Sequence, residues 1–83
     1  MATLIPTRDE LRDFFAEELE LPADVVGYES DFETDLGVDS LATMEILVQL
    51  EKKYGIRLEE SEFAGLTSVN AVHAFLADRL EAA

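Results

Sequence analysis

The residues best suited to chemistry stand together in mid-chain, at residues 35–41, which read DLGVDSL. Ser40 carries a hydroxyl group, and Asp39 before it is a good N-cap for a helix that begins at the serine. Backbone amides and the macrodipole at a helix N-terminus favour an anion. Gly37 lets the loop turn tightly before that helix. The segment predicts a serine at the start of a capped helix, at a position that favours an anion, although an ordinary capped helix would use the same residues.

Catalytic and metal-binding interpretations fit the sequence less well. Residues 31–35 resemble the start of an EF-hand loop, but Leu36 stands where glycine is required and Ala42 where the final glutamate is required. His73 is the only histidine, and no G-x-S-x-G motif is present. We therefore predict no catalytic residue, no metal site and no enzyme activity, with His73 half-exposed on a helix; loose binding of divalent cations to the clustered acids stays open.

A first helix and a long loop precede the serine. Thr7 and Glu10 form a T-x-x-E capping box, and we expect Pro22 to end the helix. Residues 20–38 show no sustained period, so they predict an ordered loop, with a short helical turn, that its apolar residues pin onto the core. The apolar residues that recur at helical spacing in the helix are Leu11, Phe14, Phe15 and Leu19, and those expected to pin the loop onto the core are Val25, Val26, Tyr28, Phe32 and Leu36.

Further helices follow the serine. A second helix is predicted from about Ser40 to Tyr54, ending before Gly55. Residues 56–58 are expected to be extended, and residues 59–63 to form a short helix. A final helix begins at Thr67 or Ser68 and runs to about Leu80, with its apolar positions at Val69, Val72, Phe75, Leu76 and Leu80. The chain is predicted to be all-α, a small three-to-four-helix bundle with a long first loop.

The second helix has two apolar faces. At 100° per residue, one side is expected to face the core and comprises Thr43, Ile46, Leu47, Leu50 and Tyr54. A second stripe, Leu41, Met44 and Val48, is rotated by roughly 130° from it and is flanked by Glu45 and Glu51. Either these residues belong to the core, with the first loop covering part of the stripe and Leu41 the most buried member, or the stripe is exposed and binds a partner.

Charge and composition narrow the class of partner. The net charge is −13, and no basic residue stands between Arg12 and Lys52. Such a surface repels nucleic acid and anionic membranes and attracts basic proteins, although it also serves solubility.

The absence of cysteine excludes disulfides. No apolar run approaches the roughly 20 residues of a membrane span, and residues 1–6 lack the features of a signal peptide. We expect one domain, residues 1–83, in the cytoplasm.

The DLGVDSL segment resembles the D-x-G-x-D-S-L signature of acyl carrier proteins, and the resemblance extends over nearly the whole order of elements. It implies that a phosphopantetheinyl transferase attaches 4′-phosphopantetheine from coenzyme A to Ser40, with a magnesium ion that Asp39 helps to hold. The thiol of the arm would carry acyl groups as thioesters. Implied partners are a ketosynthase, an acyltransferase and other synthase enzymes, and the chain is expected to be monomeric. The stripe Leu41, Met44 and Val48, with Glu45 and Glu51, would be the partner-binding face.

Several alternatives stay open within and outside this family. Lys52 and Lys53 stand where the family often keeps acids. Peptidyl or aminoacyl carriers usually show G-G-[HD]-S, whereas residues 37–40 here are GVDS, which favours an acyl group. Polyketide and fatty acid carriers share every residue used above; general resemblance over residues 32–41 favours the polyketide type. Because the chain begins at Met1 without flanking linkers, we expect a discrete carrier. Outside the family, an unmodified acidic helical adaptor that binds basic proteins would explain the charge.

Overall fold

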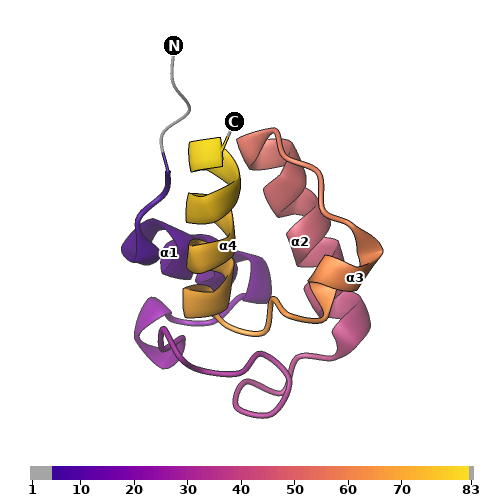
Figure 1. Cartoon of the computed structure of the whole chain (residues 1–83). Coiled ribbons are helices and arrows are strands. Elements are labelled where there is room, and N and C mark those ends of the chain that lie inside the picture. Colours follow the sequence, from indigo (N-terminus) through magenta and orange to yellow (C-terminus); the bar gives the residue numbers. More distant parts are fainter. Residues whose placement is uncertain (1–4, 83) are drawn as a thin grey trace.

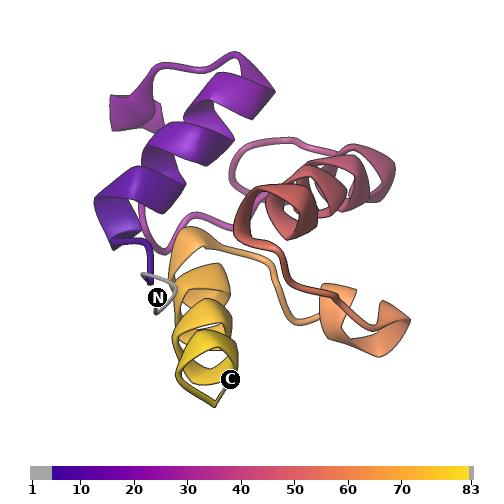
Figure 2. The same cartoon turned by 90° about the horizontal axis from the view of Figure 1, so that it is seen from above.

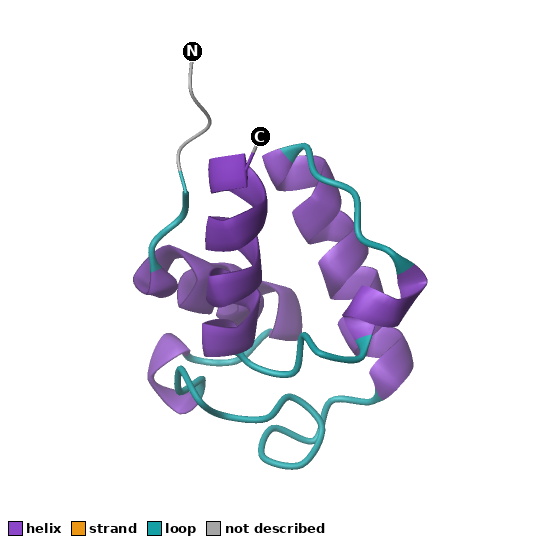
Figure 3. Cartoon of the chain, in the orientation of Figure 1, coloured by secondary structure: helices purple, strands orange, loops and turns teal. Residues whose placement is uncertain are grey.

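The computed structural model describes residues 5–82, and the side chains of residues 5–79. Within this range the chain is helical and has no strand (Figures 1 and 3), as predicted; its elements are α1 (Arg8–Leu19), the 3-10 turn η1 (Ala23–Val25), α2 (Ser40–Tyr54), α3 (Glu60–Phe63) and α4 (Val69–Ala82). Seen from above, α1, α2 and α4 surround a common centre, and the short α3 lies at the corner opposite α1 (Figure 2). None of these helices is long and apolar enough to cross a membrane.

The first helix begins as predicted and ends earlier. Thr7 Oγ1 accepts a hydrogen bond from the Glu10 amide at 3.1 Å, and the Glu10 carboxylate accepts one from the Thr7 amide at 3.2 Å, which confirms the capping box. The helix ends at Leu19 because Glu20 adopts a left-handed conformation, φ 58°. Pro22 therefore does not end the helix; it precedes η1 as its N-cap residue.

The long first loop is ordered and anchored in the core. Val26 and Phe32 are buried, and Tyr28 and Leu36 pack at the edge of the core. The expectation that Val25 is buried was wrong: its side chain is 50% exposed, because neighbouring residues leaving the 3-10 turn point in different directions and only Val26 faces inward. The loop runs across one end of the bundle towards α2 (Figure 1).

The remaining helices have the predicted positions. α2 has its predicted bounds and ends where Gly55 adopts φ 65°. α3 begins at Glu60, with Glu59 as its cap, and the Ser68 hydroxyl accepts a hydrogen bond from the Ala71 amide at the start of α4. Leu80, named above as an apolar position of this helix, lies outside the described side chains. The core consists of Leu11, Phe15, Ala16, Val26, Phe32, Ile46, Leu47, Leu50, Leu58, Leu66, Val69, Val72 and Leu76.

Candidate functional site

Ser40 is the first residue of α2, is exposed, and borders a cleft of about 520 Å³. The first loop forms one wall of the cleft at residues 31–34, and α3 with residues 64, 66 and 67 forms another. The α2 residues that line it are Ser40, Thr43, Met44 and Leu47. The volume falls within the roughly 300–1,000 Å³ of small-molecule sites. A group attached to Ser40 therefore starts at the mouth of a cleft that is partly apolar.

The N-terminus of α2 suits an added negative charge. Asp39 Oδ1 accepts a hydrogen bond from the Ala42 amide at 2.8 Å, as an N-cap does. The first turn of α2 itself holds no acid, whereas α1 and α3 each carry two acids in their first turns. Free amides at a helix N-terminus stabilise an anion, so the end of α2 can accept the phosphate of an arm on Ser40. Gly37 adopts φ 70° and makes the tight approach to this end, as predicted.

The acidic loop beside Ser40 is a hydrogen-bonded turn. The Asp31 carboxylate accepts from the backbone amides of Glu33 and Thr34, each at 2.9 Å, and the Asp35 carboxylate accepts from the Asp31 amide at 2.8 Å. The amide bonds from Thr34, then Glu33, hold the pKa of Asp31 below its ordinary value, against desolvation that raises it. These carboxylates thus shape the turn that forms the first-loop wall.

The apolar stripe on α2 faces outward. Leu41, Met44 and Val48 are 66%, 42% and 37% exposed, while Ile46 and Leu47 on the other face are buried. The expectation that Leu41 is the most buried of the three was wrong. The loop before α2 packs Leu36 and Val38 against the core and leaves the stripe uncovered. The stripe and Ser40 therefore share one accessible surface.

Of the charged residues around the stripe, some lie exposed on the surface and others contact neighbouring side chains or backbone. Glu45 is exposed beside it. Glu51, predicted as its second flank, is half-buried, and its Oε2 accepts a hydrogen bond from the Leu58 amide at 2.6 Å. Lys53 lies over the Phe14 ring, 5.2 Å from its centre, whereas Lys52 is exposed one turn beyond Val48. Sequence reasoning missed the Glu51 contact, because nothing local in the sequence indicates its partner seven residues away.

Comparison with known proteins decides the family. A family model described as the phosphopantetheine attachment site matches residues 9–76. Polyketide-8 synthase acyl carrier protein 2 of Streptomyces avermitilis is 41% identical over 73 residues, 88% of this chain and 84% of the relative. The chain belongs to the acyl carrier protein family. An acyl carrier protein of Streptomyces coelicolor is 37% identical over 89% of this carrier and 82% of the relative. An acyl carrier protein of Campylobacter hominis is also 37% identical, over 82% of this carrier and 86% of the relative.

Membership confirms two predictions made from the sequence. The carrier holds acyl groups, and phosphopantetheine is its prosthetic group. Family membership also implies that synthase enzymes and a phosphopantetheinyl transferase act on it. His73 is half-exposed, as predicted, and borders a separate shallow hollow with Asp9 and Tyr28.

Proposed function

We propose that Ser40 is the residue that carries the phosphopantetheine arm, on one carrier domain formed by residues 1–83. The observation that carries this proposal is the position of Ser40: exposed, first in α2, and bordering the cleft. The helix N-terminus stabilises the phosphate through its amides. When attached, the arm supplies the thiol that holds an acyl group as a thioester. The exposed hydroxyl and the absence of acids in the first turn both fit that group.

Asp39 is proposed to have two roles. One carboxylate oxygen caps α2 by accepting from the Ala42 amide. A carboxylate has two oxygens, so the second can coordinate a magnesium ion at the interface with the transferase while the cap is kept.

The exposed stripe is proposed as the partner-binding face. Leu41, Met44 and Val48 form its apolar centre, and Glu45 is its charged rim. An enzyme that binds this face holds Ser40 near its own entrance, since the stripe lies within two to three turns of the serine. Glu51 belonged to the predicted face, and its contact with Leu58 turns it towards the α2–α3 connection, so we assign it a smaller share of binding.

The pathway is proposed to be polyketide biosynthesis, with a ketosynthase and an acyltransferase among the partners. Its support is the 41% identity to a carrier that is named for a polyketide synthase. Fatty acid biosynthesis is the alternative, since the two relatives at 37% identity are named only as acyl carrier proteins.

Intact mass spectrometry tests the attachment site. The purified chain is incubated with coenzyme A, magnesium and a broad-specificity phosphopantetheinyl transferase, and we expect one phosphopantetheine mass to be added. Ser40→Ala should stay folded and gain no mass, while Ser30→Ala, another loop serine, should be modified like the parent. Modification of Ser40→Ala at any other serine would overturn the assignment.

A charge reversal tests the partner-binding face. Rim charges act mostly on the association rate, so Glu45→Lys should slow modification by the transferase, most strongly at low salt. Glu29→Lys, an exposed acid on the first loop, makes the same change in net charge away from the stripe and should have a smaller effect. Equal slowing by both variants would show that net charge alone steers the encounter.

A further inference from the structure

α3, which lines part of the cleft, packs on the core through one partly buried side chain, Phe63. α3 is a single turn, Glu60–Phe63, and contributes no buried side chain. A helix this short is not stable by itself. Yet Glu60, Phe63 and Ala64 line the cleft beside Ser40. Contacts made by residues outside α3 therefore contribute to holding this wall in place.

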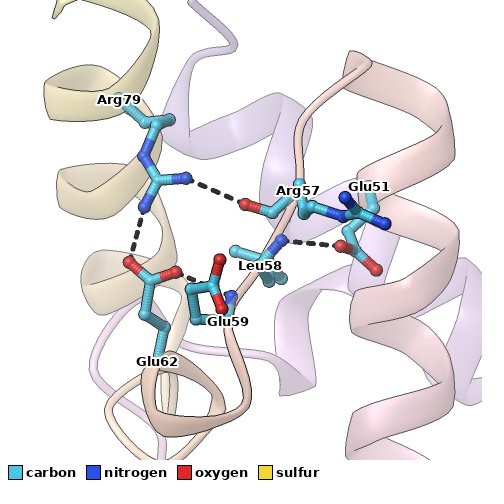
Figure 4. Close-up of polar contacts among 6 residues, drawn as sticks. All are labelled: Glu51, Arg57, Leu58, Glu59, Glu62 and Arg79. Atoms are coloured by element: carbon cyan, nitrogen blue, oxygen red, sulfur yellow. Dashed lines mark hydrogen bonds and ion pairs between the residues drawn. The ribbon is translucent and has the colours of Figure 1, made fainter.

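Two of those contacts come from one arginine on α4. Arg79 Nη2 donates to Glu62 Oε2 at 2.5 Å, and Arg79 Nη1 donates to the carbonyl oxygen of Arg57 at 2.8 Å (Figure 4). The two guanidinium nitrogens thus hold both α3 and the segment that leads into it. The other carboxylate oxygen of Glu62 accepts from the Glu59 amide at 2.8 Å and caps α3. Glu62 links the cap of α3 to α4 through a single side chain.

The guanidinium is itself held in place. It lies over the Phe75 ring, 4.6 Å from the ring centre, and its ion pair with Glu62 is partly buried on both sides. A planar guanidinium that stacks on an aromatic ring loses less freedom on pairing than an exposed lysine does. On the other side of the connection, Glu51 holds the Leu58 amide, and Leu58 is buried. The α2–α3 connection is thus tied to α2 by Glu51 and to α4 by Arg79.

We propose that Arg79 is a positioning residue that holds α3 against the cleft and thereby sets the room available to an acyl chain on Ser40. This rests on the proposed attachment at Ser40. Arg79 does not line the cleft; it acts through Glu62 and the Arg57 carbonyl. Because α3 lacks a buried anchor, loss of Arg79 frees α3 locally while the core stays folded.

Hydrogen exchange on the unmodified protein tests the hold on α3 without any arm. In Arg79→Ala, exchange at the amides of Glu62, Gly65 and Leu66, which donate within this turn, should rise about tenfold, as charge-assisted hydrogen bonds are lost. Amides of residues 46–50 should change little. The matched control is Arg57→Ala, which removes the same charge from an exposed side chain and keeps the carbonyl that Arg79 binds. Arg79→Lys keeps the charge but cannot make both hydrogen bonds of the guanidinium, so its exchange rates should lie between those of Arg79→Ala and Arg57→Ala.

A second measurement uses the loaded protein. Acetyl and octanoyl groups are loaded with the corresponding acyl-coenzyme A, and cleavage of each thioester by hydroxylamine is followed by mass. Arg79→Ala should raise the octanoyl-to-acetyl ratio of cleavage rates, and Arg57→Ala should not. A failure to load appears directly in the mass spectrum and contradicts only the attachment site. The role of Arg79 would be overturned if the exchange rates of Arg79→Ala matched those of Arg57→Ala, or if they rose equally over residues 46–50. If Arg79→Ala does not fold, the exchange and cleavage measurements are both made on Arg79→Lys instead.

Discussion

The cleft beside Ser40 has two walls, the first loop at residues 31–34 and α3, and they are attached to the molecule in different ways. Phe32 on the loop is 2% exposed and packs on Phe15 with ring centres 4.7 Å apart. Its amide also donates to the Thr67 carbonyl at 2.9 Å. α3 has no fully buried side chain, and it is held by the partly buried Phe63 and by the ion pair between Glu62 and Arg79. Burial is lost only when the core opens, whereas an ion pair near the surface can break locally. The comparison predicts that the first loop at residues 31–34 is a fixed wall of the cleft and that α3 is an adjustable wall.

The largest effect is expected from removing the anchor of the fixed wall. Phe32→Ala should lower the free energy of unfolding by about 3–5 kcal/mol, because it deletes a fully buried ring and leaves a cavity. Denaturant melts measure this. Val25→Ala, on the same loop but half-exposed, should cost less than about 0.5 kcal/mol. Similar losses for the two variants would contradict the description of this loop as pinned by particular residues.

A smaller effect is expected from the corresponding ring on the adjustable wall. Phe63 is only partly buried at the cleft, so Phe63→Ala should cost about 1–2 kcal/mol from the smaller area returned to water. Hydrogen exchange should rise mainly in α3. A loss as large as that for Phe32→Ala would show that α3 belongs to the cooperative core and that the two walls do not differ.

A still smaller loss of unfolding free energy is expected when a side chain is truncated on the α2 surface between the two walls. Met44 is 42% exposed, so Met44→Ala should change the free energy of unfolding by less than about 1 kcal/mol. It should speed dissociation from the transferase, because central apolar contacts act mostly on the dissociation rate. Leu47→Ala, on the buried face of α2, should instead cost about 2–5 kcal/mol. A loss in that range for Met44→Ala would place Met44 in the core and remove the centre of the partner-binding face.

The smallest effect is expected from the acidic turn of the fixed wall, and it depends on pH. Amide hydrogen bonds lower the pKa of Asp31 in the folded state. Its contribution to stability is therefore present above its ordinary pKa of 3.8 and is lost as the pH falls through the folded value. The difference in unfolding free energy between the parent and Asp31→Asn should shrink as the pH is lowered from 7 to about 3.

The control for the pH experiment is Asp24→Asn, which removes the same charge from the first loop. Among the described residues, no hydrogen bond to the Asp24 side chain is present, and the side chain is exposed. The difference in unfolding free energy between Asp24→Asn and the parent should change less over this pH range than the difference for Asp31→Asn. If the two variants titrate alike, long-range repulsion in this acidic chain, and not the turn, sets the pH dependence.

The sequence by itself determined the start of α1, both ends of α2 and the place of Ser40, because these depend on residues within about four positions of one another; it did not determine the end of α1. The capping box of Thr7, the cap at Asp39 and the turn at Gly55 each act locally, so their pattern could be read directly. The D-x-G-x-D-S-L signature is equally local, and the comparisons confirmed the family that it indicates.

Only the tertiary structure decided which apolar residues face water and how the cleft is built. Val25 and Leu41 match core patterns, but their exposure depends on where the loop packs its other side chains. The contact from Arg79 to Glu62 spans 17 residues, and that to the Arg57 carbonyl spans 22. No periodicity or capping rule selects one acid among 19 for one arginine at such separations. That choice follows from how α3 and α4 lie in space, which is set by the packing of the whole core.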